Sequence, residues 1–590
     1  MRIVTSRSAR TSLLLLTCLI VFAPEAFGQQ QSPTPLPASA DDVVRVKTEL
    51  IQTDVTVLDK HGRFAGGLKP EQFELRVDAK AQPLAFFEQV TTGSTEEEKL
   101  VTAARDGKAA ALAKLETNAD ATPNRQLIFF FVDDLHLAGD SLTRARSVLI
   151  HFIENKMRAN DRVAIVSTSG QIGFLQQLTD NKAVLREAVS RLHYKSNPET
   201  IASQVSISEV DANLVANRGE RGLFAYLVEA TMKEFQMQNP INAVNIVKNR
   251  VRQINAQSKL SELETLSRLE TLIRSSAPLA GRKIVFFLSD GFVMDIKRSN
   301  GRDVMQRVAN EAARVGAVVY TLDTRANFLG ASVDASRNDY PDFSPRTAGR
   351  SLLESKAPQE PLETLADETG GRSYLNSNAL DDGVSQALAE SSSYYLLVWR
   401  PGTESQRAGR SRIDVTIKDR PDLRVRMRRH FFDFKPNQTA KPINPLTGTP
   451  EDQLRLALGS LYPRRDLPTS VSASLANTAD KGIVLQVSMQ LEAEMLSFDA
   501  SAGKQQAVVD VLGVALDDRG LFSSFKQKLE IPRAAVAANG RLVKWNQSLQ
   551  LPTGLYQVRV AVRDRQSGRA GSAMVWIEIP RLEPNPSRPQ

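Results

Sequence analysis

Two short apolar runs that each end in an acidic residue constrain the fold of this chain more than any other feature. Leu127–Asp134 has the sequence LIFFFVDD, and Lys283–Gly291 has the sequence KIVFFLSDG. A run of bulky β-branched and aromatic residues without polar alternation is typical of a strand buried on both faces of a parallel sheet. Ligands of open α/β sheets bind beyond the carboxyl ends of the strands, so Asp133, Asp134 and Asp290 are the first candidate site residues.

The surrounding pattern predicts a doubly wound, mostly parallel α/β domain over residues 125–400. Strand-like and helix-like stretches alternate there, as they do in successive βαβ units. We expect Tyr394–Trp399 to be the last strand of this set. Residues 196–276 interrupt the alternation with a polar, helix-rich stretch, which we interpret as an insertion. A capping-box pattern at Ser261 and Glu264 predicts that a helix begins there.

The flanking segments show strand-like alternation instead. Residues 43–90 predict a small β module, and residues 411–434 return to paired strands that would complete it around the α/β domain. Residues 452–581 predict a β-sandwich. The expected fold class is therefore multidomain α/β plus β, with a Rossmann-like sheet flanked by a small β module and a C-terminal β-sandwich. Composition also predicts linkers and a loose tail at residues 91–124, 435–451 and 582–590.

Residues 1–28 have the pattern of a secretory signal. Arginines precede an apolar core, and residues 26–28 form a small-x-small cleavage site. We therefore expect an exported, periplasmic or extracellular protein, cleaved near Gly28 and followed by a Pro/Gln/Ser tether at 29–42. The only cysteine, Cys18, lies in this segment, so no disulfide is expected. No stretch reaches the ~20 apolar residues that a bilayer span needs, so no transmembrane segment is expected.

The charge of the chain could favour anionic surfaces but does not specify a nucleic-acid partner. A formal net charge of +8 spread over 590 residues is a mild bias. The densest basic cluster, Arg424, Arg426, Arg428 and Arg429, alternates with apolar residues, and we interpret it as the solvated outer face of a strand. We expect no nucleic-acid partner.

Longer motifs connect the chain with a known family. The domain at about 125–400 resembles a von Willebrand factor A (VWA) domain in its first strand ending in Asp, its Ser289-Asp290-Gly291 turn and the GAVVYTLD strand that follows. Over about 43–434 the chain resembles, more narrowly, the VWFA-related family found mainly in acidobacteria. The residues that carry this resemblance are VTVLDKHGRFAGGLKPEQFEL, LAGRKIVFFLSDGF, LADETGGRS, YYLLVWRP and RVRMRRHFF.

The VWA resemblance implies a Mg²⁺ site at the carboxyl edge of the sheet. VWA domains usually hold Mg²⁺ through an Asp-x-Ser-x-Ser motif, a Thr from a later loop and an Asp after the fourth strand, with one position left for a partner's carboxylate. Asp133 matches the first of these positions and Asp290 the last. The serines do not match, because Leu135 and Leu137 stand in their places.

A rebuilt metal site would use Asp133, Asp134 and Asp290, with Thr200 from the inserted loop, and would bind Mg²⁺ or, in its place, Mn²⁺ or Ca²⁺. The alternative interpretation is that these carboxylates cap helices or accept backbone N–H bonds at strand ends. If the three acids lay close together without a cation, their repulsion would raise the pKa of at least one of them.

Motifs for other chemistry are missing. The sequence has no HExxH pair, no Walker loop and no G-x-S-x-G elbow, so we expect no enzyme. The leading hypothesis is an exported VWA-like protein-binding or adhesion module that engages its partner at the carboxyl edge of the parallel sheet. The alternatives are a structural envelope or extracellular assembly protein with an inert acidic edge, and an unrecognised metal-dependent hydrolase.

Overall fold

The computed structural model describes much of the chain between residues 51 and 580. The expected signal segment, the tether, the tail, most of the two linkers and Thr200 lie outside the described residues. The described residues are 51–94, 97, 126–194, 207–277, 279, 281–294, 299–325, 350–377, 379–399, 411–428, 430–431, 449–459, 463–464, 466–478, 482–498, 505–517, 520–534 and 542–580.

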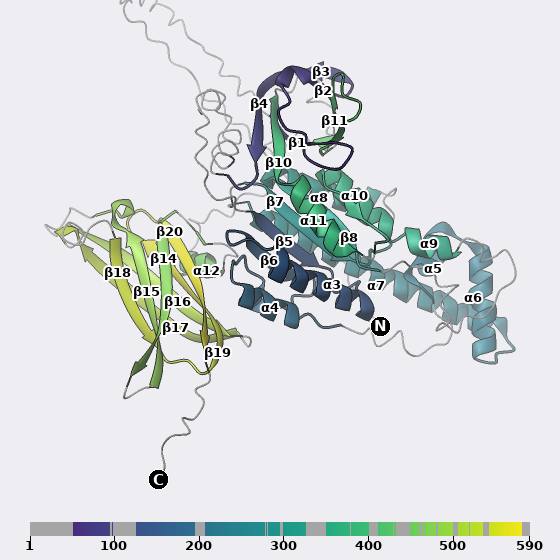
Figure 1. Cartoon of the computed structure of the whole chain (residues 1–590). Coiled ribbons are helices and arrows are strands. Elements are labelled where there is room, and N and C mark those ends of the chain that lie inside the picture. Colours follow the sequence, from purple (N-terminus) through teal and green to yellow (C-terminus); the bar gives the residue numbers. More distant parts are fainter. Residues whose placement is uncertain are drawn as a thin grey trace, which may run out of the picture. The chain divides into compact units, whose positions relative to one another are not determined.

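Five parallel strands form the sheet of the α/β domain (Figure 1). Their order is β6-β5-β7-β8-β9, and each neighbouring pair is parallel. The predicted parallel sheet is therefore confirmed. The strands are β5 (Leu127–Val132), β6 (Arg162–Ser167), β7 (Lys283–Ser289), β8 (Ala317–Asp323) and β9 (Ser373–Tyr374).

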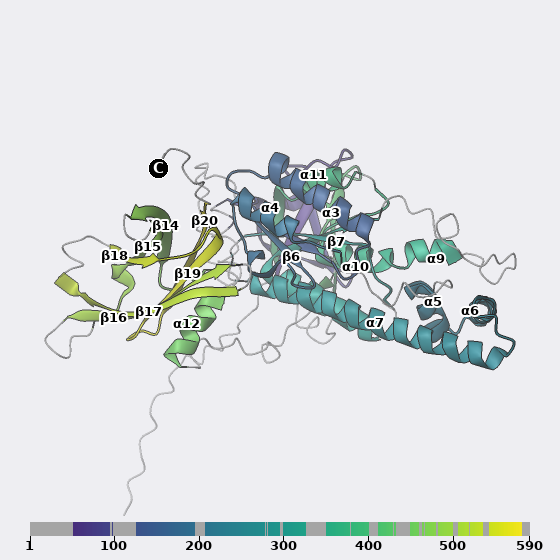
Figure 2. The ribbon, with the colours of Figure 1, turned by 90° about the horizontal axis from the view of Figure 1, so that it is seen from below.

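Helices cover both faces of this sheet, because successive side chains of a strand point to opposite sides. In β5, Ile128, Phe130 and Val132 join one hydrophobic cluster, while Phe129 and Phe131 join the other. Figure 2 shows α3 and α4 on one side of the strands and α7 on the other. The first cluster takes residues from α3 (Gly139–His151), α4 (Lys182–Ser190) and α11 (Leu380–Glu390), and the second from α7 (Pro240–Ser275), α8 (Ser299–Val315) and α10 (Gln359–Thr369).

The last strand predicted for the α/β set belongs to a different sheet. β10 (Ser393–Trp399) pairs antiparallel with β1 (Ile51–Leu58) on one side and β4 (Leu84–Thr91) on the other. The prediction was wrong because nearly every residue of β10 is buried. An unbroken apolar run indicates burial on both faces and does not distinguish a parallel from an antiparallel strand.

β10 completes the β module, and the sequence of the α/β domain is inserted between the strands of this module. One sheet has the order β12-β1-β10-β4 and the other β13-β11-β2-β3, and residues of both sheets share one hydrophobic cluster. The chain enters the α/β domain after β4 and returns from it through β10. The remaining strands are β2 (Phe73–Val77), β3 (Lys80–Gln82), β11 (Ser411–Ile417), β12 (Arg424–Arg426) and β13 (His430–Phe431).

Part of the basic cluster around β12 contacts the protein rather than solvent. Arg424 is exposed, as predicted for a solvated face. Arg426 instead donates from Nη1 to the carbonyl oxygen of Gly371, 3.3 Å away, and Arg428 donates to the carbonyl oxygen of Gln52. The alternation with apolar residues therefore indicated a strand correctly but did not identify its contact with the end of α10.

A helical extension occupies much of the predicted insertion. It comprises α5 (Glu209–Asn213), α6 (Arg221–Glu234) and the first half of α7. The helix predicted to begin at Ser261 begins much earlier, because Asn239 caps it and Pro240 takes its first position. No helix in the described segments combines the length and the apolar character that a bilayer span requires.

The described residues of the C-terminal part include the α-helix α12 (Pro450–Gly459) and two antiparallel sheets. Their orders are β14-β15-β18 and β17-β16-β19-β20, and one hydrophobic cluster contains residues of both. The β-sandwich expected for residues 452–581 stays a prediction. The strands are β14 (Thr469–Thr478), β15 (Gly482–Glu492), β16 (Gln506–Asp517), β17 (Gly520–Pro532), β18 (Leu542–Leu549), β19 (Gly554–Asp564) and β20 (Ala570–Ile579).

Candidate functional site

The carboxyl ends of the central strands bring acidic residues to one edge of the sheet. Asp133 directly follows β5, Asp290 directly follows β7, and Asp323 ends β8. The parallel register aligns these ends, with Val132 opposite Leu288. The sequence-predicted Asp133, Asp134 and Asp290 therefore lie at this edge, as expected from the strand pattern.

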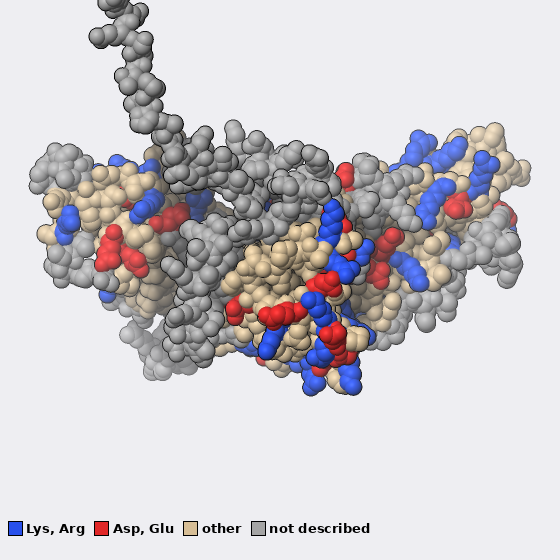
Figure 3. All heavy atoms as spheres, turned by 90° about the horizontal axis from the view of Figure 1, so that it is seen from above, with Lys and Arg blue, Asp and Glu red and all other residues tan. Residues whose placement is uncertain are grey.

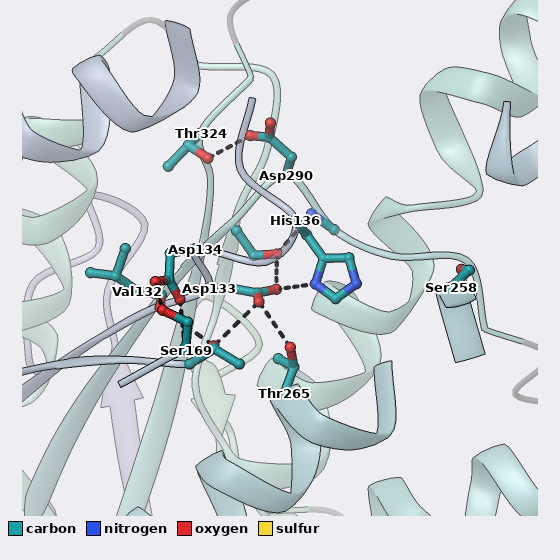
Figure 4. A network of polar contacts seen from close by, with 12 residues as sticks. Val132, Asp133, Asp134, His136, Ser169, Ser258, Thr265, Asp290 and Thr324 are labelled. Atoms are coloured by element: carbon teal, nitrogen blue, oxygen red, sulfur yellow. Dashed lines mark hydrogen bonds and ion pairs between the residues drawn. The ribbon is translucent and has the colours of Figure 1, made fainter. Parts of the chain in front are cut away.

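Asp133 is the most enclosed of these carboxylates (Figure 4). Its Oδ2 accepts hydrogen bonds from Ser289 Oγ at 2.7 Å and from His136 Nδ1 at 2.8 Å. Its Oδ1 accepts from Thr265 Oγ1 at 2.9 Å and from Thr168 Oγ1 at 3.3 Å. The donors come from four places in the chain: β7, the turn after β5, α7 and the end of β6. Asp133 therefore joins the strand ends to α7, the helix whose first half belongs to the helical extension.

His136 forms a buried ion pair with Asp133. Burial by itself would lower the pKa of His136, but the charge of Asp133 and its hydrogen bond outweigh burial and raise this pKa to about 9. The ring lies 5.3 Å from that of Phe292, centroid to centroid. Among the described residues, Nε2 of His136 is buried and has no hydrogen-bond partner.

Two glutamates, one in α5 and one in α7, influence the pKa of His136. Glu209 in α5 and Glu262 in α7 both act to raise the pKa of His136 through their charge. Glu209 Oε2 accepts a hydrogen bond from Ser258 Oγ at 2.9 Å. Burial raises the pKa of Glu262 to about 7, although Lys259 and His136 act in the opposite direction. These acidic groups and the imidazole make up the ionisable part of the site.

Asp134 turns away from Asp133 and orders the loop after β6. Its Oδ1 accepts from the backbone N of Ser169 at 2.8 Å. Its Oδ2 accepts from Ser169 Oγ and from Gln171 Nε2, the latter at 2.6 Å. The contact with the backbone N of Ser169 is of the kind that the alternative interpretation describes, in which strand-end acids accept backbone N–H bonds.

Asp290 binds the first turn of α3. Its Oδ2 accepts from the backbone N of Ala138, which precedes α3, at 2.9 Å, and its Oδ1 accepts from Thr324 Oγ1 at 2.6 Å. Burial is the main cause that raises the pKa of Asp290, and the nearby charge of Asp323 adds to it. The acid whose charge contributes to the raised pKa of Asp290 is therefore Asp323.

Gly291 allows the chain to bend sharply after Asp290. Its φ is +80°, a conformation that glycine adopts without steric cost. A Cβ at this position would lie 2.0 Å from the carbonyl oxygen of Pro358. Only glycine fits between β7 and the start of α10, and this fit fixes the direction in which Asp290 leaves the strand.

The expected metal does not fit the described contacts. Both oxygens of Asp133 already accept two hydrogen bonds each, and the raised pKa of His136 favours the cationic form of that donor. Among the described segments, no three His, Cys, Asp or Glu side chains are grouped so that they could hold a metal ion. The fourth predicted ligand, Thr200, lies outside the described residues.

Sequence reasoning missed the three hydroxyls that surround Asp133. They belong to Thr168, Thr265 and Ser289, whereas the serines of the Asp-x-Ser-x-Ser motif lie two and four residues after the acid. Ser289 carried a signal, because it precedes Asp290 in a strand expected beside Asp133. Thr265 carried none, since its helix was expected to begin only four residues earlier.

Comparison with known proteins adds no identification. The chain matches no protein-family model, and no curated protein is detectably similar to it.

Proposed function

We propose that this chain is an exported protein-binding or adhesion module, with a VWA-like α/β domain that engages a protein partner at the carboxyl edge of its sheet. The strands with the strongest apolar runs, β5 and β7, lie side by side in the sheet and both end in acids. Thr265 of α7 contacts Asp133 at this edge. The first half of the same helix is part of the helical extension. Binding residues often lie on segments carried by such a rigid scaffold.

The distribution of exposed apolar side chains carries the proposal. Six of the thirteen large hydrophobic residues that are exposed in the described chain lie on or next to α6, α7 and α9 (Arg350–Lys356). Leu260 and Leu263 are 69% and 39% exposed and lie one helical turn apart on α7. Neighbouring exposed apolar side chains, such as Leu260 and Leu263, are typical of protein-interaction surfaces, whereas single exposed residues are common everywhere. The other four of these six exposed residues are Phe235, Ile241, Leu352 and Leu353.

The surface charges support a protein partner rather than nucleic acid. On the face in Figure 3, Lys and Arg side chains lie among Asp and Glu side chains. On α7 and α8, for example, Arg274 pairs with both Glu270 and Glu311. A polyanion usually requires a basic patch or stripe of one sign.

One observation favours the second candidate, a structural assembly protein with an inert acidic edge. Asp133 and Asp134 direct their oxygens to donors within the same chain. An edge of this kind offers a partner no free carboxylate. A metal-dependent hydrolase, the third candidate, has no comparable support, because catalysis by a bound metal needs an open coordination position.

Paired substitutions on the full chain distinguish the first two candidates. The variant Leu260→Ser/Leu263→Ser removes exposed apolar surface from α7 without altering its buried face. Its matched control, Leu521→Ser/Phe522→Ser, removes residues that are 63% and 41% exposed on β17. Partners cross-linked to each protein in its own cell envelope or medium are quantified by mass spectrometry. We expect a partner that is lost from the α7 variant and retained by the β17 control.

The opposite outcome of the cross-linking experiment would contradict the proposal. If both variants retain the same partners at the same level, the α7 surface is not the binding surface and the assembly interpretation stands. Adding a chelator to the capture tests the cation, because a Mg²⁺-mediated contact would be lost while a direct contact would remain.

Export is also part of the proposal and has its own test. It rests on the signal pattern in residues 1–28. N-terminal sequencing of protein recovered from the periplasm or medium should begin near Gln29. Recovery only of a chain that retains Met1 would contradict export with cleavage.

A further inference from the structure

We propose that the imidazolium of His136 is a built-in counter-cation for Asp133 and takes the place of the divalent cation expected at this edge. The inference goes beyond the proposed function, since it concerns the charge balance of the edge whether or not a partner binds there. It rests on the contacts of Asp133, the burial of both side chains and the groups that face His136.

The carboxylate of Asp133 has no position left for a metal. Its two oxygens accept four hydrogen bonds, from the hydroxyls of Thr168, Thr265 and Ser289 and from the Nδ1 of His136. A carboxylate has about four lone-pair positions. A cation could bind Asp133 only by displacing one of these donors, and His136 is the donor that carries charge.

The burial of the pair makes a counter-charge necessary. The side chain of Asp133 is 0% exposed and that of His136 is 4% exposed. An ionised carboxylate in such surroundings is strongly destabilising unless it is paired and hydrogen-bonded. The three hydroxyls supply hydrogen bonds but no charge, and within the described ranges His136 is the side chain that can place a positive charge directly against Asp133.

The groups around His136 also favour a positive charge at this position. Asp133 faces the ring from the turn after β5, Glu209 from α5 and Glu262 from α7. Lys259, also in α7, influences Glu262 from the same helix. The Nε2 atom points away from Asp133 in Figure 4 and has no partner among the described residues. A second cation beside this ring would be repelled by it, so the edge is complete without a metal.

Thermal unfolding of the full mature chain, with added Mg²⁺ or Mn²⁺ and with chelator, tests the proposal. The wild type should give the same melting temperature in all these conditions. His136→Ala should lower that temperature, and Mg²⁺ or Mn²⁺ should then partly restore it, because Asp133 and three hydroxyls form an oxygen set that a hard cation accepts. His193→Ala, which removes an exposed histidine, is the matched control. It should change neither the melting temperature nor its response to added cations.

Two further proteins define the outcomes. In Asp133→Asn/His136→Ala the cation effect should vanish, because the carboxylate is gone. If divalent cations raise the melting temperature of the wild type and Asp133→Asn abolishes that rise, the edge binds a metal in the native protein and the proposal is overturned. It is also overturned if Mg²⁺ and Mn²⁺ both fail to stabilise a folded His136→Ala protein.

A measurement on the wild type covers the case in which His136→Ala does not fold. Nitrogen-15 spectra of the histidine rings should show one ring with protons on both nitrogens at neutral pH, assigned by substituting the other four histidines singly. A neutral His136 ring at neutral pH would show that no imidazolium balances Asp133, and would also overturn the proposal.

Discussion

The buried pair of Asp133 and His136 makes the stability of the α/β domain depend on pH. The pKa of His136 rises from 6.5 to about 9 on folding. A group with a raised pKa contributes fully below its unfolded value, and this contribution is lost as the pH rises through the folded value. Glu262 acts in the same direction, because burial raises its pKa from 4.5 to about 7.

We therefore expect the free energy of unfolding to fall steadily between about pH 4.5 and pH 9. A rise from 6.5 to about 9 corresponds to roughly 3 kcal/mol for His136. Urea unfolding monitored at a series of pH values measures this change. In His136→Gln, which keeps an N–H donor without the charge, the decline above neutral pH should be absent. A decline of the same size in that variant would assign it to other groups.

Part of the candidate site could be predicted from the sequence, and the rest could not. Asp133, Asp134 and Asp290 could be placed at one edge because each follows an apolar run, and parallel strands align their carboxyl ends. The partners of Asp133 could not be placed, because Thr265 lies 132 residues away and Thr168 lies 35 residues away. Hydroxyl side chains have no sequence periodicity that identifies which of them will meet a buried acid.

At the scale of elements, α7 joins two separate cores. Its 36 residues span ~54 Å. Leu266, Leu269 and Leu272 pack against the sheet, whereas Val247 and Val251 pack against α5 and α6. Thr265 marks the change between the two halves and binds Asp133. A displacement of the extension therefore acts directly on the carboxyl edge.

Breaking α7 between its two cores should release the extension alone. Gln257 is exposed and lies between the two packed halves. Proline inside a helix costs about 3 kcal/mol or more, because it removes a hydrogen bond and clashes with the preceding turn. In Gln257→Pro we expect hydrogen exchange to accelerate across residues 240–256, while residues 266–275 stay protected. Gln257→Ala is the control and should exchange like the wild type. Equal loss of protection in both halves would show that α7 opens as one unit.

The elements that sequence reasoning placed wrongly share one physical cause. β10 and the start of α7 depend on contacts with distant parts of the chain, and local patterns describe only burial or periodicity. An apolar run such as YYLLVW fits the centre of either kind of sheet. A capping-box pattern inside a helix is common, because Ser and Glu are also tolerated on its surface.

At the scale of the molecule, the β module depends on strands from both sides of the α/β domain. β1 pairs with β10 and β12, and β2 pairs with β11. The alternating pattern of residues 43–90 and 411–434 was sufficient to suggest that strands of these two segments pair. The contribution of β10 was not predictable, since the same segment also fitted the α/β set.

Two truncated chains test this dependence. A chain that ends at Phe434 keeps all strands of the β module, whereas one that ends at Trp399 lacks β11, β12 and β13. The loss of β11 removes Ile413 and Val415 from the hydrophobic cluster of the module. We expect the longer chain to unfold cooperatively and the shorter one to be less stable by several kcal/mol, since each large buried apolar side chain contributes about 1.5–3 kcal/mol. Equal melting temperatures would contradict this.

The strand order of the β module also determines when its strands can pair during synthesis on the ribosome. Among the described strands, β1 pairs only with β10 and β12, so Ile51 meets its partner Trp399 only after the ribosome has made the whole α/β domain. β4 waits equally long, because β10 is its only partner in the described sheet. Unpaired strands are templates for wrong association between chains. The first strands of the nascent protein therefore remain unpaired, and open to such association, until β10 and β12 have been made.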